Sequence, residues 1–477
     1  MNKNFIAGEW LEGADINLNI NPSDTNDVVG EYARADASQA SMAVDAAFEA
    51  APNWGRSTAE VRSDALDRIG TEILARREEL GRLLAREEGK TLPEGIGEVV
   101  RAGRVFKFFA GEALRLSGER LASIRPGVEA DVRREPEGVV GIITPWNFPI
   151  AIPAWKIAPA LAFGNAVVFK PADLVPGSAW ALAEIIVRAG ALPSGVFNLV
   201  MGPGSKVGDV FAKSKKVRAL TFTGSTGTGR SIGMTCMERG AKVQLEMGGK
   251  NPLIILDDAD LNQAVEVAVS GSFFSTGQRC TASSRLIVQD GIHDRFVEAV
   301  IKRLSSLKVD HALSEGCDMG PVVSQAQLKQ DCDYIKSARE EGGILACGGE
   351  LLTRGTPGFY LSPALITETT NQMRINREEV FGPVASVIRV KDYEEAVMLA
   401  NDTEFGLSSG ICTTSLKHSS DFKQRSTAGM VMVNVPTAGV DYHAPFGGRK
   451  NSSYGPREQG GYAKEFYTSV KTTYTLA

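Results

Sequence analysis

The sequence predicts an α/β protein with two domains, each containing a β-sheet flanked by helices. Between Trp155 and Ser272, short apolar runs rich in β-branched residues alternate with segments of helical character. A second alternation of this kind begins at Asp260 and reaches Asn401. Apolar strands separated by helices of this length indicate βαβ units, and hence a doubly wound parallel sheet in the first domain. The usual ligand of such a sheet is a nucleotide.

The chain before the first alternation is predicted to be helical after a short opening strand. The strand and its turn lie in MNKNFIAGEWLEG. From Ser38 to Gly89 the chain is rich in alanine and has apolar residues and Glu/Arg pairs three or four positions apart, which predicts helices. VRREPEGVVGIITPW (132–146) then predicts a polar strand, a turn at 136–138 and a buried strand.

Strands and helices then follow in alternation. In the first domain the predicted strands are AVVFKPA (166–172), VFNLVMG (196–202), RALTFTG (218–224), KVQLEMGG (242–249) and PLIILDD (252–258). The helices between them cover 179–189, 205–212 and 227–239. In the second domain we expect a helix over 260–274, a strand at SRLIVQD (284–290), a helix over 293–307 and a strand and helix within ASVIRVKDYEEAVMLAN (385–401).

The composition excludes several classes of protein. With 477 residues, 43% hydrophobic and 23% charged, the chain matches a compact soluble protein of several domains. Its 52 Lys+Arg and 57 Asp+Glu give a formal net charge of −5, so no general attraction to nucleic acid or to an anionic membrane is expected. The most apolar stretch, Val139 to Trp155, contains Asn147 and three prolines and is too short and too interrupted to span a bilayer. A small soluble ligand is therefore predicted.

The cysteines indicate a reducing compartment. None of the six is at CxxC spacing or clustered with the four histidines, so neither a metal site nor a disulfide framework is expected. The N-terminus lacks the charged, apolar and small-residue succession of a signal peptide. We therefore expect a cytoplasmic protein.

Two glycine-rich turns and one strand end are candidates for binding a nucleotide. Gly224 and Ser225 follow a predicted strand in TFTGSTGTGRSIG, and MGPGSKVG (201–208) is a similar turn. Glycine at such a turn lets backbone N–H groups approach a phosphate, although either segment is equally compatible with a tight turn alone. Lys170 ends a strand in FKPAD, at the edge where an α/β sheet presents its ligand crevice, so it and the following Asp173 are candidates for binding ribose or a ribose phosphate; a solvated strand end is the alternative.

Three polar residues are candidates for catalysis. Cys280 in STGQRCTASSR is flanked by small polar residues and by Arg279, which predicts an exposed thiol whose cationic neighbour lowers its pKa; a solvated loop cysteine is the alternative. Glu246 in QLEMGGKN lies among apolar residues, which raise the pKa of a carboxyl toward that of a general base, and a salt-bridged glutamate is the alternative. Asn147 in TPWNFP is either a turn-capping residue or an amide donor to an oxyanion.

Together these segments resemble the aldehyde dehydrogenase superfamily over almost the whole chain. TPWNFP, FKPAD, FTGSTGTG, LEMGGKN, GQRC, EEVFGP and PFGGRK each look like a motif of that family, and they occur in the family's order. The resemblance implies an aldehyde dehydrogenase-like fold. Its parts would be a Rossmann-like cofactor domain (1–117 and 137–248), an α/β catalytic domain (249–450) and a small β oligomerisation element (118–136 and 451–477).

The resemblance also implies roles for individual residues. Cys280 is expected to be the nucleophile, Glu246 the general base and Asn147 the oxyanion donor, together with the backbone N–H of Cys280. No metal is expected. The residues expected to contact NAD or NADP are Lys170 and Asp173 at the adenosine ribose, Gly224 and Ser225 at the pyrophosphate, Glu379 and Phe381 at the nicotinamide ribose and ring, and also Thr144, Trp146 and Gly204.

The implied reaction is the oxidation of an aldehyde to a carboxylic acid. The Cys280 thiolate adds to the aldehyde, the thiohemiacetal loses hydride to nicotinamide C4, and Glu246 activates the water that hydrolyses the resulting thioester. Similar enzymes that transfer the acyl group to coenzyme A typically lack an acid at this position, so Glu246 favours hydrolysis. A cofactor-independent cysteine esterase and a catalytically silent structural relative are the alternatives from other classes.

Two features bear on specificity. Asp173 stands where many NAD-dependent members carry glutamate, and the shorter acid leaves space for a 2′-phosphate near Lys170, so we expect NADP to be preferred over NAD. The run beginning VPTAGVDYHAPFGGRK looks most like α-ketoglutaric semialdehyde (2,5-dioxopentanoate) dehydrogenases, and succinate semialdehyde dehydrogenases are a close second. Similar proteins are homodimers or homotetramers, and this chain is expected to be one of the two.

Both candidate substrates carry a carboxylate at the far end, which requires a cation in the pocket. Arg279 is the first candidate for this anchor and Arg101 the second, and the alternative for Arg279 is that it only tunes the thiol. Phe148, Trp155 and Phe274 are expected to line the apolar walls.

Overall fold

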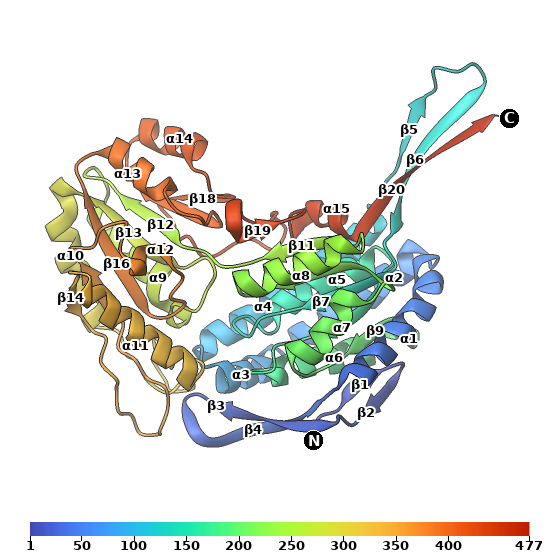
Figure 1. Cartoon of the computed structure of the whole chain (residues 1–477), viewed down its shortest axis with the longest axis horizontal. Helices are drawn as coiled ribbons and strands as arrows, with labels where there is room; N and C mark the ends of the chain where they lie inside the picture. The colour runs from blue at the N-terminus through green and yellow to red at the C-terminus, as the bar shows by residue number, and fades with distance from the viewer. Residues whose placement is uncertain (477) are drawn as a thin grey trace.

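The structure, a computed structural model that describes residues 1–476, confirms the predicted α/β fold. Figure 1 shows two lobes, each built around one sheet, and an arm of three strands that projects from the first lobe. The N-terminal half of the chain forms the first lobe, and most of the C-terminal half forms the second.

The first sheet has eight strands in the order β19-β11-β10-β7-β8-β9-β1-β2. Its five central strands are parallel, and antiparallel strands flank them at both edges. The bounds are β1 (Asn4–Ile6), β2 (Glu9–Leu11), β7 (Val139–Ile143), β8 (Ala166–Lys170), β9 (Phe197–Leu199), β10 (Val217–Thr223), β11 (Lys242–Glu246) and β19 (Ser453–Tyr454).

Helices cover both faces of the first sheet. Val140 and Ile142 of β7 belong to the core on one face, whereas Val139 and Ile143 belong to the core on the other. Because both faces are buried, β7 and β8 are almost wholly apolar, which is why the sequence revealed them. The first face is covered by α2 (Ala59–Ala75), α3 (Arg77–Glu88), α4 (Leu92–Leu114), α5 (Ala151–Ala162) and α6 (Pro176–Gly190), and the second by α1 (Ala37–Gly55), the π-turn η1 (Gly204–Gly208), α7 (Asp209–Lys213) and α8 (Thr226–Glu238).

The second sheet has seven strands in the order β14-β15-β16-β13-β12-β17-β18. All neighbouring pairs are parallel except β14 and β15. The strands are β12 (Asn251–Ile255), β13 (Ser283–Gln289), β14 (Ile344–Cys347), β15 (Ala364–Thr367), β16 (Val384–Val390), β17 (Ser408–Cys412) and β18 (Met430–Val433). The helices are α9 (Leu261–Phe273), α10 (Asp290–Ser305), α11 (Gln325–Glu340), α12 (Arg374–Arg377), α13 (Tyr393–Asn401) and α14 (Leu416–Arg425).

The projecting arm is a three-stranded antiparallel sheet. It pairs β20 (Thr468–Leu476) and β5 (Glu119–Ala122) with β6 (Val128–Pro136), the strand predicted from its polar sequence. The short helix α15 (Lys464–Tyr467) precedes β20, and β19 returns to the first sheet. The division into 1–117 with 137–248, 249–450, and 118–136 with 451–477 stays a prediction.

Two elements near the site were not predicted from the sequence. The hairpin of β3 (Asp15–Asn21) and β4 (Asp24–Arg34) has no continuous apolar run, because much of both strands is exposed. Helix α11 is also new, and it packs beside the end of β15 and α12. Within residues 1–476, no helix combines the length and the apolarity needed to cross a membrane.

Candidate active site

Cys280 lies on a constrained loop between α9 and β13. The loop begins with the turn η2 (Phe274–Gly277), where Ser275, Thr276 and Gly277 all have positive φ, at 51°, 57° and 64°. A Cβ at Gly277 would lie 2.2 Å from the carbonyl oxygen of Gly382, so only glycine fits there. Asn251 of β12 donates to the backbone carbonyl of Cys280 at 2.7 Å. These contacts fix the backbone that presents the thiol.

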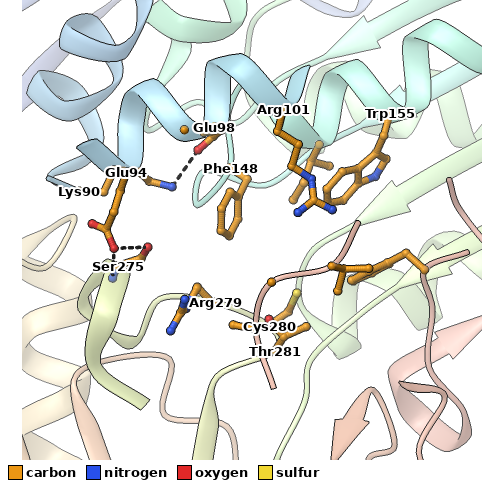
Figure 2. A pocket seen from close by; sticks show the side chains of 16 residues that line it. Lys90, Glu94, Glu98, Arg101, Phe148, Trp155, Ser275, Arg279, Cys280 and Thr281 are labelled. Carbon is orange, nitrogen blue, oxygen red and sulfur yellow. Dashed lines mark hydrogen bonds and ion pairs between the residues drawn. The ribbon is translucent and has the colours of Figure 1, made fainter. Parts of the chain in front are cut away.

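The environment of the Cys280 thiol disfavours the thiolate. Burial of the sulfur, followed by the charges of Glu379 and Glu246, raises the thiol pKa to about 12. The prediction of an exposed thiol with a lowered pKa is therefore wrong: Cys280 is half-buried and its net pKa is raised, although the charge of Arg279 is within electrostatic range of it. Arg279 donates to the backbone carbonyls of Ser270 and Gly271, and Figure 2 shows its side chain pointing away from Cys280. Thiolate formation here requires a positive charge brought close to the sulfur.

Glu246 is the last residue of β11 and is buried at the carboxyl edge of the first sheet. Burial, and then repulsion by Glu458, raises the pKa of the Glu246 carboxyl well above its usual range. The negative charge of Glu246 interacts electrostatically with the Cys280 thiol and helps to raise the thiol pKa. Its Oε2 accepts a hydrogen bond from Ser453 Oγ at 2.5 Å. The carboxyl is thus within electrostatic range of the sulfur, and its raised pKa is the direction of shift that a general base near neutral pH needs.

A buried ion pair that the sequence reasoning missed lies behind Glu246. Lys156 of α5 donates to Glu458 and, at 2.6 Å, to Thr221 Oγ1 of β10. Both charged side chains are at most 1% exposed. Because Lys156 and Glu458 are 302 positions apart, no local pattern could have revealed the pair. It places a second carboxylate within electrostatic range of the candidate base.

Ser453 provides a test of the Glu246 environment. Its hydrogen bond lowers the pKa of the carboxyl, so Ser453→Ala is expected to raise that pKa further and to move the acid limb of the pH profile of kcat upward. One lost charge-assisted hydrogen bond corresponds to about one pH unit. The measurement is kcat between about pH 6 and about pH 10. An acid limb that stays in place, or moves downward, contradicts this assignment of Glu246.

Asn147 lies on the loop between β7 and α5, and buried charges hold this loop. Lys90 donates to the backbone carbonyl of Asn147 at 2.8 Å and to Glu98 at 2.8 Å. Glu98 in turn accepts from the backbone N–H groups of Ile150 and Ala151, at the start of α5. The Asn147 side chain donates to the Gln278 carbonyl at 2.9 Å. Its amide therefore lies beside the Cys280 loop, as an oxyanion donor requires.

One cavity reaches Cys280 from the side of the first sheet. Its volume is about 250 Å³. Trp146, Asn147, Gly224, Ser225, Glu379 and Phe381, all predicted to bind the cofactor or the oxyanion, line it together with Cys280. Glu379 accepts from the Gly249 N–H at 2.8 Å, and burial raises the pKa of its carboxyl to about 7. The remaining lining residues are Pro145, Ile152, Thr223, Met247, Gly248, Gln327 and Gln330.

Helix α11 supports the loop that carries Glu379 and Phe381. Phe381 has φ of 65°, a strained backbone for a side chain of this size, and its ring meets that of Trp146 edge-on at 5.4 Å. Gln327 and Gln330 both donate to the Val380 carbonyl, at 3.0 and 2.9 Å. These glutamines were missed because α11 itself was not predicted.

The other predicted cofactor residues lie along the same sheet edge. Lys170 ends β8, and its backbone carbonyl accepts from the Thr144 N–H at 3.2 Å. The Thr144 hydroxyl is buried and has no partner among residues 1–476. Ser225 caps α8, and neither Gly204 nor Gly227 would place a Cβ within 4 Å of another atom, so open space adjoins both turns. The carboxyl ends of the strands, the glycine turns and the buried donors fit a dinucleotide.

A second cavity reaches Cys280 from the opposite side. Figure 2 shows Arg101, Phe148 and Trp155 above this cavity and Arg279, Cys280 and Thr281 below it. Its volume is about 260 Å³. Phe274, predicted to line the pocket, packs instead against the core under the second sheet. The other lining residues are Lys90, Glu94, Gly97, Glu98, Ile152, Ser275, Ala438, Gly439, Val440 and Phe446.

The arrangement has a simple chemical meaning. Cys280 lines both cavities, so groups held in the two cavities would meet beside the thiol. Among the described residues, no cluster of three or more His, Cys, Asp or Glu side chains is arranged to hold a metal ion. The six cysteines are all free thiols.

Comparison with known proteins places the chain in a family. Residues 10–473 match the family model described as aldehyde dehydrogenase family. An α-ketoglutaric semialdehyde dehydrogenase of Bacillus subtilis (strain 168) is 44% identical over 99% of this chain and 97% of its own length. A succinate-semialdehyde dehydrogenase [NADP(+)] of Escherichia coli (strain K12) is 38% identical over 98% of this chain and 96% of its own length.

A solved structure shows the same fold. The crystal structure of betaine aldehyde dehydrogenase from Staphylococcus aureus in complex with NAD+ has a TM-score of 0.97 to this chain at 36% identity, and the match covers 100% of this chain and 95% of the other. The motifs, the two cavities that meet at a cysteine and the match over nearly the full length agree, and the chain belongs to the aldehyde dehydrogenase family.

Proposed function

We propose that this protein oxidises a carboxylated semialdehyde to the corresponding dicarboxylic acid with NAD or NADP as hydride acceptor. The α-ketoglutaric semialdehyde is the favoured substrate, and succinate semialdehyde is the second candidate. The observation that carries the proposal is the position of Cys280 between a cavity lined by the predicted nicotinamide contacts and a cavity lined by two guanidinium groups. The greater similarity to the B. subtilis relative than to the E. coli relative supports the order of the two substrates.

Glu379 and Phe381 would hold the ribose and ring of a nicotinamide, which when bound would supply the hydride acceptor and a positive charge near the sulfur. A cation beside the sulfur would lower the raised pKa of the Cys280 thiol and favour loss of its proton to solvent. Cys280 Sγ then adds to the aldehyde carbon. Asn147 Nδ2 and the Cys280 N–H donate to the oxygen that becomes negative, and expulsion of hydride leaves a thioester on Cys280.

Glu246 completes the reaction by accepting a proton from water. The hydroxide adds to the thioester carbonyl, the C–S bond breaks, and the acid leaves with Cys280 restored. In the structure Ser453 Oγ donates to Glu246 Oε2. The other oxygen, Oε1, lies against Gly447, where an added Cβ would be 2.9 Å from it. A modest rotation of the Glu246 side chain toward the thioester is therefore part of the proposed step.

Arg101 is the better placed of the two candidate carboxylate anchors. Its Nη2 donates to Gln459 at 3.2 Å, its guanidinium lies over the Trp155 ring, and its Nε is buried without a partner within residues 1–476. The Nε of Arg279 is likewise buried without a partner within residues 1–476, but its Nη2 donates to two backbone carbonyls, which turns the guanidinium away from the thiol. A carboxylate entering the cavity would satisfy the free donors of Arg101.

Substitution of Arg101 tests this assignment. Arg101→Gln is expected to raise KM for α-ketoglutaric semialdehyde about 10- to 100-fold and KM for propanal less than about threefold, because one charge-assisted contact is lost. Arg104→Gln, an exposed arginine one turn further along α4, is the matched control. Arg279→Ala is expected to have a smaller and less selective effect. Equal losses for the two aldehydes in both variants would eliminate a carboxylate anchor.

The arm is proposed to join copies of this chain into a homodimer or homotetramer. Its exposed apolar side chains, Leu121, Ile124, Val470 and Tyr474, lie on a thin projecting sheet that has no core of its own. A cytoplasmic location is proposed from the free cysteines, which suit a reducing compartment.

A further inference from the structure

We propose that Arg34 determines whether the protein accepts a phosphate on the 2′ oxygen of the adenosine ribose. The proposal rests on the proposed NAD(P)-dependent function and adds a residue to its cofactor site. Arg34 is the last residue of β4, in the hairpin that the sequence did not reveal. It would act together with Lys170 as a pair of cations around Asp173.

Arg34 pairs with Asp173, the acid expected at the adenosine ribose. Its Nη2 donates to Asp173 Oδ2 at 2.7 Å, and the two side chains are 28% and 33% exposed. Asn17 of β3 donates to the backbone carbonyl of Asp173 at 2.5 Å, so the hairpin holds this residue at two points. The sequence placed Asp173 near a ribose but showed no partner for it.

Lys170 belongs to the same cluster. Its ammonium donates to the Pro171 carbonyl at 2.7 Å, and a Cβ at Gly208 of η1 would lie 3.9 Å from Lys170 Cδ. Burial lowers the pKa of Lys170 to about 8, Asp173 opposes this shift and Arg34 adds to it. The three charges are therefore within electrostatic range of one another, at the edge where the sheet meets the η1 turn.

The net charge of Arg34, Asp173 and Lys170 decides whether the site favours a ribose with a 2′-phosphate or one with a free 2′-hydroxyl. An unpaired acid at position 173 would bind ribose hydroxyls and repel a 2′-phosphate. With Arg34 paired to Asp173 and Lys170 beside it, the three groups carry a net charge of about +1 when Lys170 is protonated. Arg34 is also paired with Asp15, at 3.6 Å, but the Asp15 side chain is 71% exposed, so solvent weakens its effect. The cluster therefore attracts a dianionic phosphate.

Arg34 also has a donor to offer. Its Nε is buried and has no hydrogen-bond partner anywhere in the described chain. A guanidinium can keep one carboxylate contact and still donate to a phosphate oxygen from another nitrogen, which an ammonium cannot do with the same geometry. An incoming phosphate would satisfy this orphaned donor and would favour the charged form of Lys170.

The test is direct binding, without aldehyde and without turnover. The purified full chain is titrated with NADPH, NADH, adenosine 2′,5′-bisphosphate and ADP, and the heat of binding gives each dissociation constant. The parent is expected to bind adenosine 2′,5′-bisphosphate at least about tenfold more tightly than ADP. Arg34→Gln is expected to weaken NADPH about 10- to 100-fold and NADH less than about threefold.

Two further variants complete the design. Arg34→Lys keeps the positive charge but loses the planar guanidinium with its several donors, and it is expected to retain part of the NADPH affinity. Arg218→Gln removes an exposed arginine near the start of β10, whereas Lys170 ends β8 at the other edge of this sheet, and it is expected to change neither dissociation constant. Retained NADH binding shows that each variant is folded.

The outcomes separate this inference from the proposed function. Equal weakening of NADPH and NADH in Arg34→Gln, or no weakening of either, overturns the role of Arg34 and leaves the dehydrogenase intact. A parent that binds neither dinucleotide overturns the proposed function as well. A parent that binds NADPH selectively but oxidises no semialdehyde would support the role of Arg34 and would contradict only the proposed substrate.

Discussion

Replacement of Cys280 by serine is expected to lower the rate of aldehyde oxidation by at least about four orders of magnitude. The hydroxyl is a far weaker nucleophile, and no other thiol lines either cavity that meets at this position. The measurement is kcat from the absorbance of the reduced nicotinamide, with NADPH binding as a check that the variant is folded. Cys347→Ser, on the edge strand β14 of the second sheet, is the matched control and is expected to retain full activity.

Residual oxidation above a few per cent in Cys280→Ser, with the control unaffected, would place the nucleophile elsewhere. Loss of NADPH binding in the same variant would show instead that the substitution disturbs the loop, since Asn251 and Gly277 fix its backbone. The two results differ in the binding measurement, so the chemistry can be separated from the fold.

Glu246→Gln is expected to separate hydride transfer from hydrolysis. Because Glu246 acts only on water in the second half of the reaction, the first turnover should still give about one reduced nicotinamide per subunit, and kcat should then fall by about 10²- to 10³-fold. The measurement is a stopped-flow trace of nicotinamide absorbance. Glu238→Gln, an exposed acid at the end of α8, is the matched control and should turn over normally.

The pH dependence of hydrolysis should follow the raised pKa of Glu246. Burial and Glu458 favour the protonated carboxyl, so the base is lost as the pH falls through a value well above that of an ordinary glutamate. The parent should therefore show an acid limb that Glu246→Gln lacks. A variant without a burst, or with a burst and unchanged kcat, would remove Glu246 from the role of base.

Much of the fold could be predicted because the central strands of both sheets are buried on both faces. β8 is apolar up to its last residue and β13 contains the apolar run Leu286–Val288, and the helices between the strands have a clear period. The β3–β4 hairpin offers no such signal, since its strands mix polar and apolar residues and are only partly buried. The residue proposed to select the cofactor, Arg34, lies in that hairpin.

The candidate site was predictable where a motif is local and not where contacts are distant. The residues around Cys280, Glu246 and Asn147 carry their own sequence signal. Ser453 and Lys156 meet their partners across 207 and 302 positions, so only the folded chain reveals them. The pKa of Cys280 was predicted in the wrong direction because burial and the distant acids Glu379 and Glu246 outweigh the neighbouring arginine, and none of these is visible in the local sequence.

The most direct measurement is the mass of the enzyme during a single turnover. Glu246→Gln is mixed with NADP and α-ketoglutaric semialdehyde, quenched in acid, digested and mapped by mass spectrometry. We expect one acyl group on the peptide that contains Cys280, in proportion to the reduced nicotinamide. We expect none in the double variant that also carries Cys280→Ser. An acyl group on another residue, or reduced nicotinamide formed without any acylated peptide, would contradict the proposed mechanism.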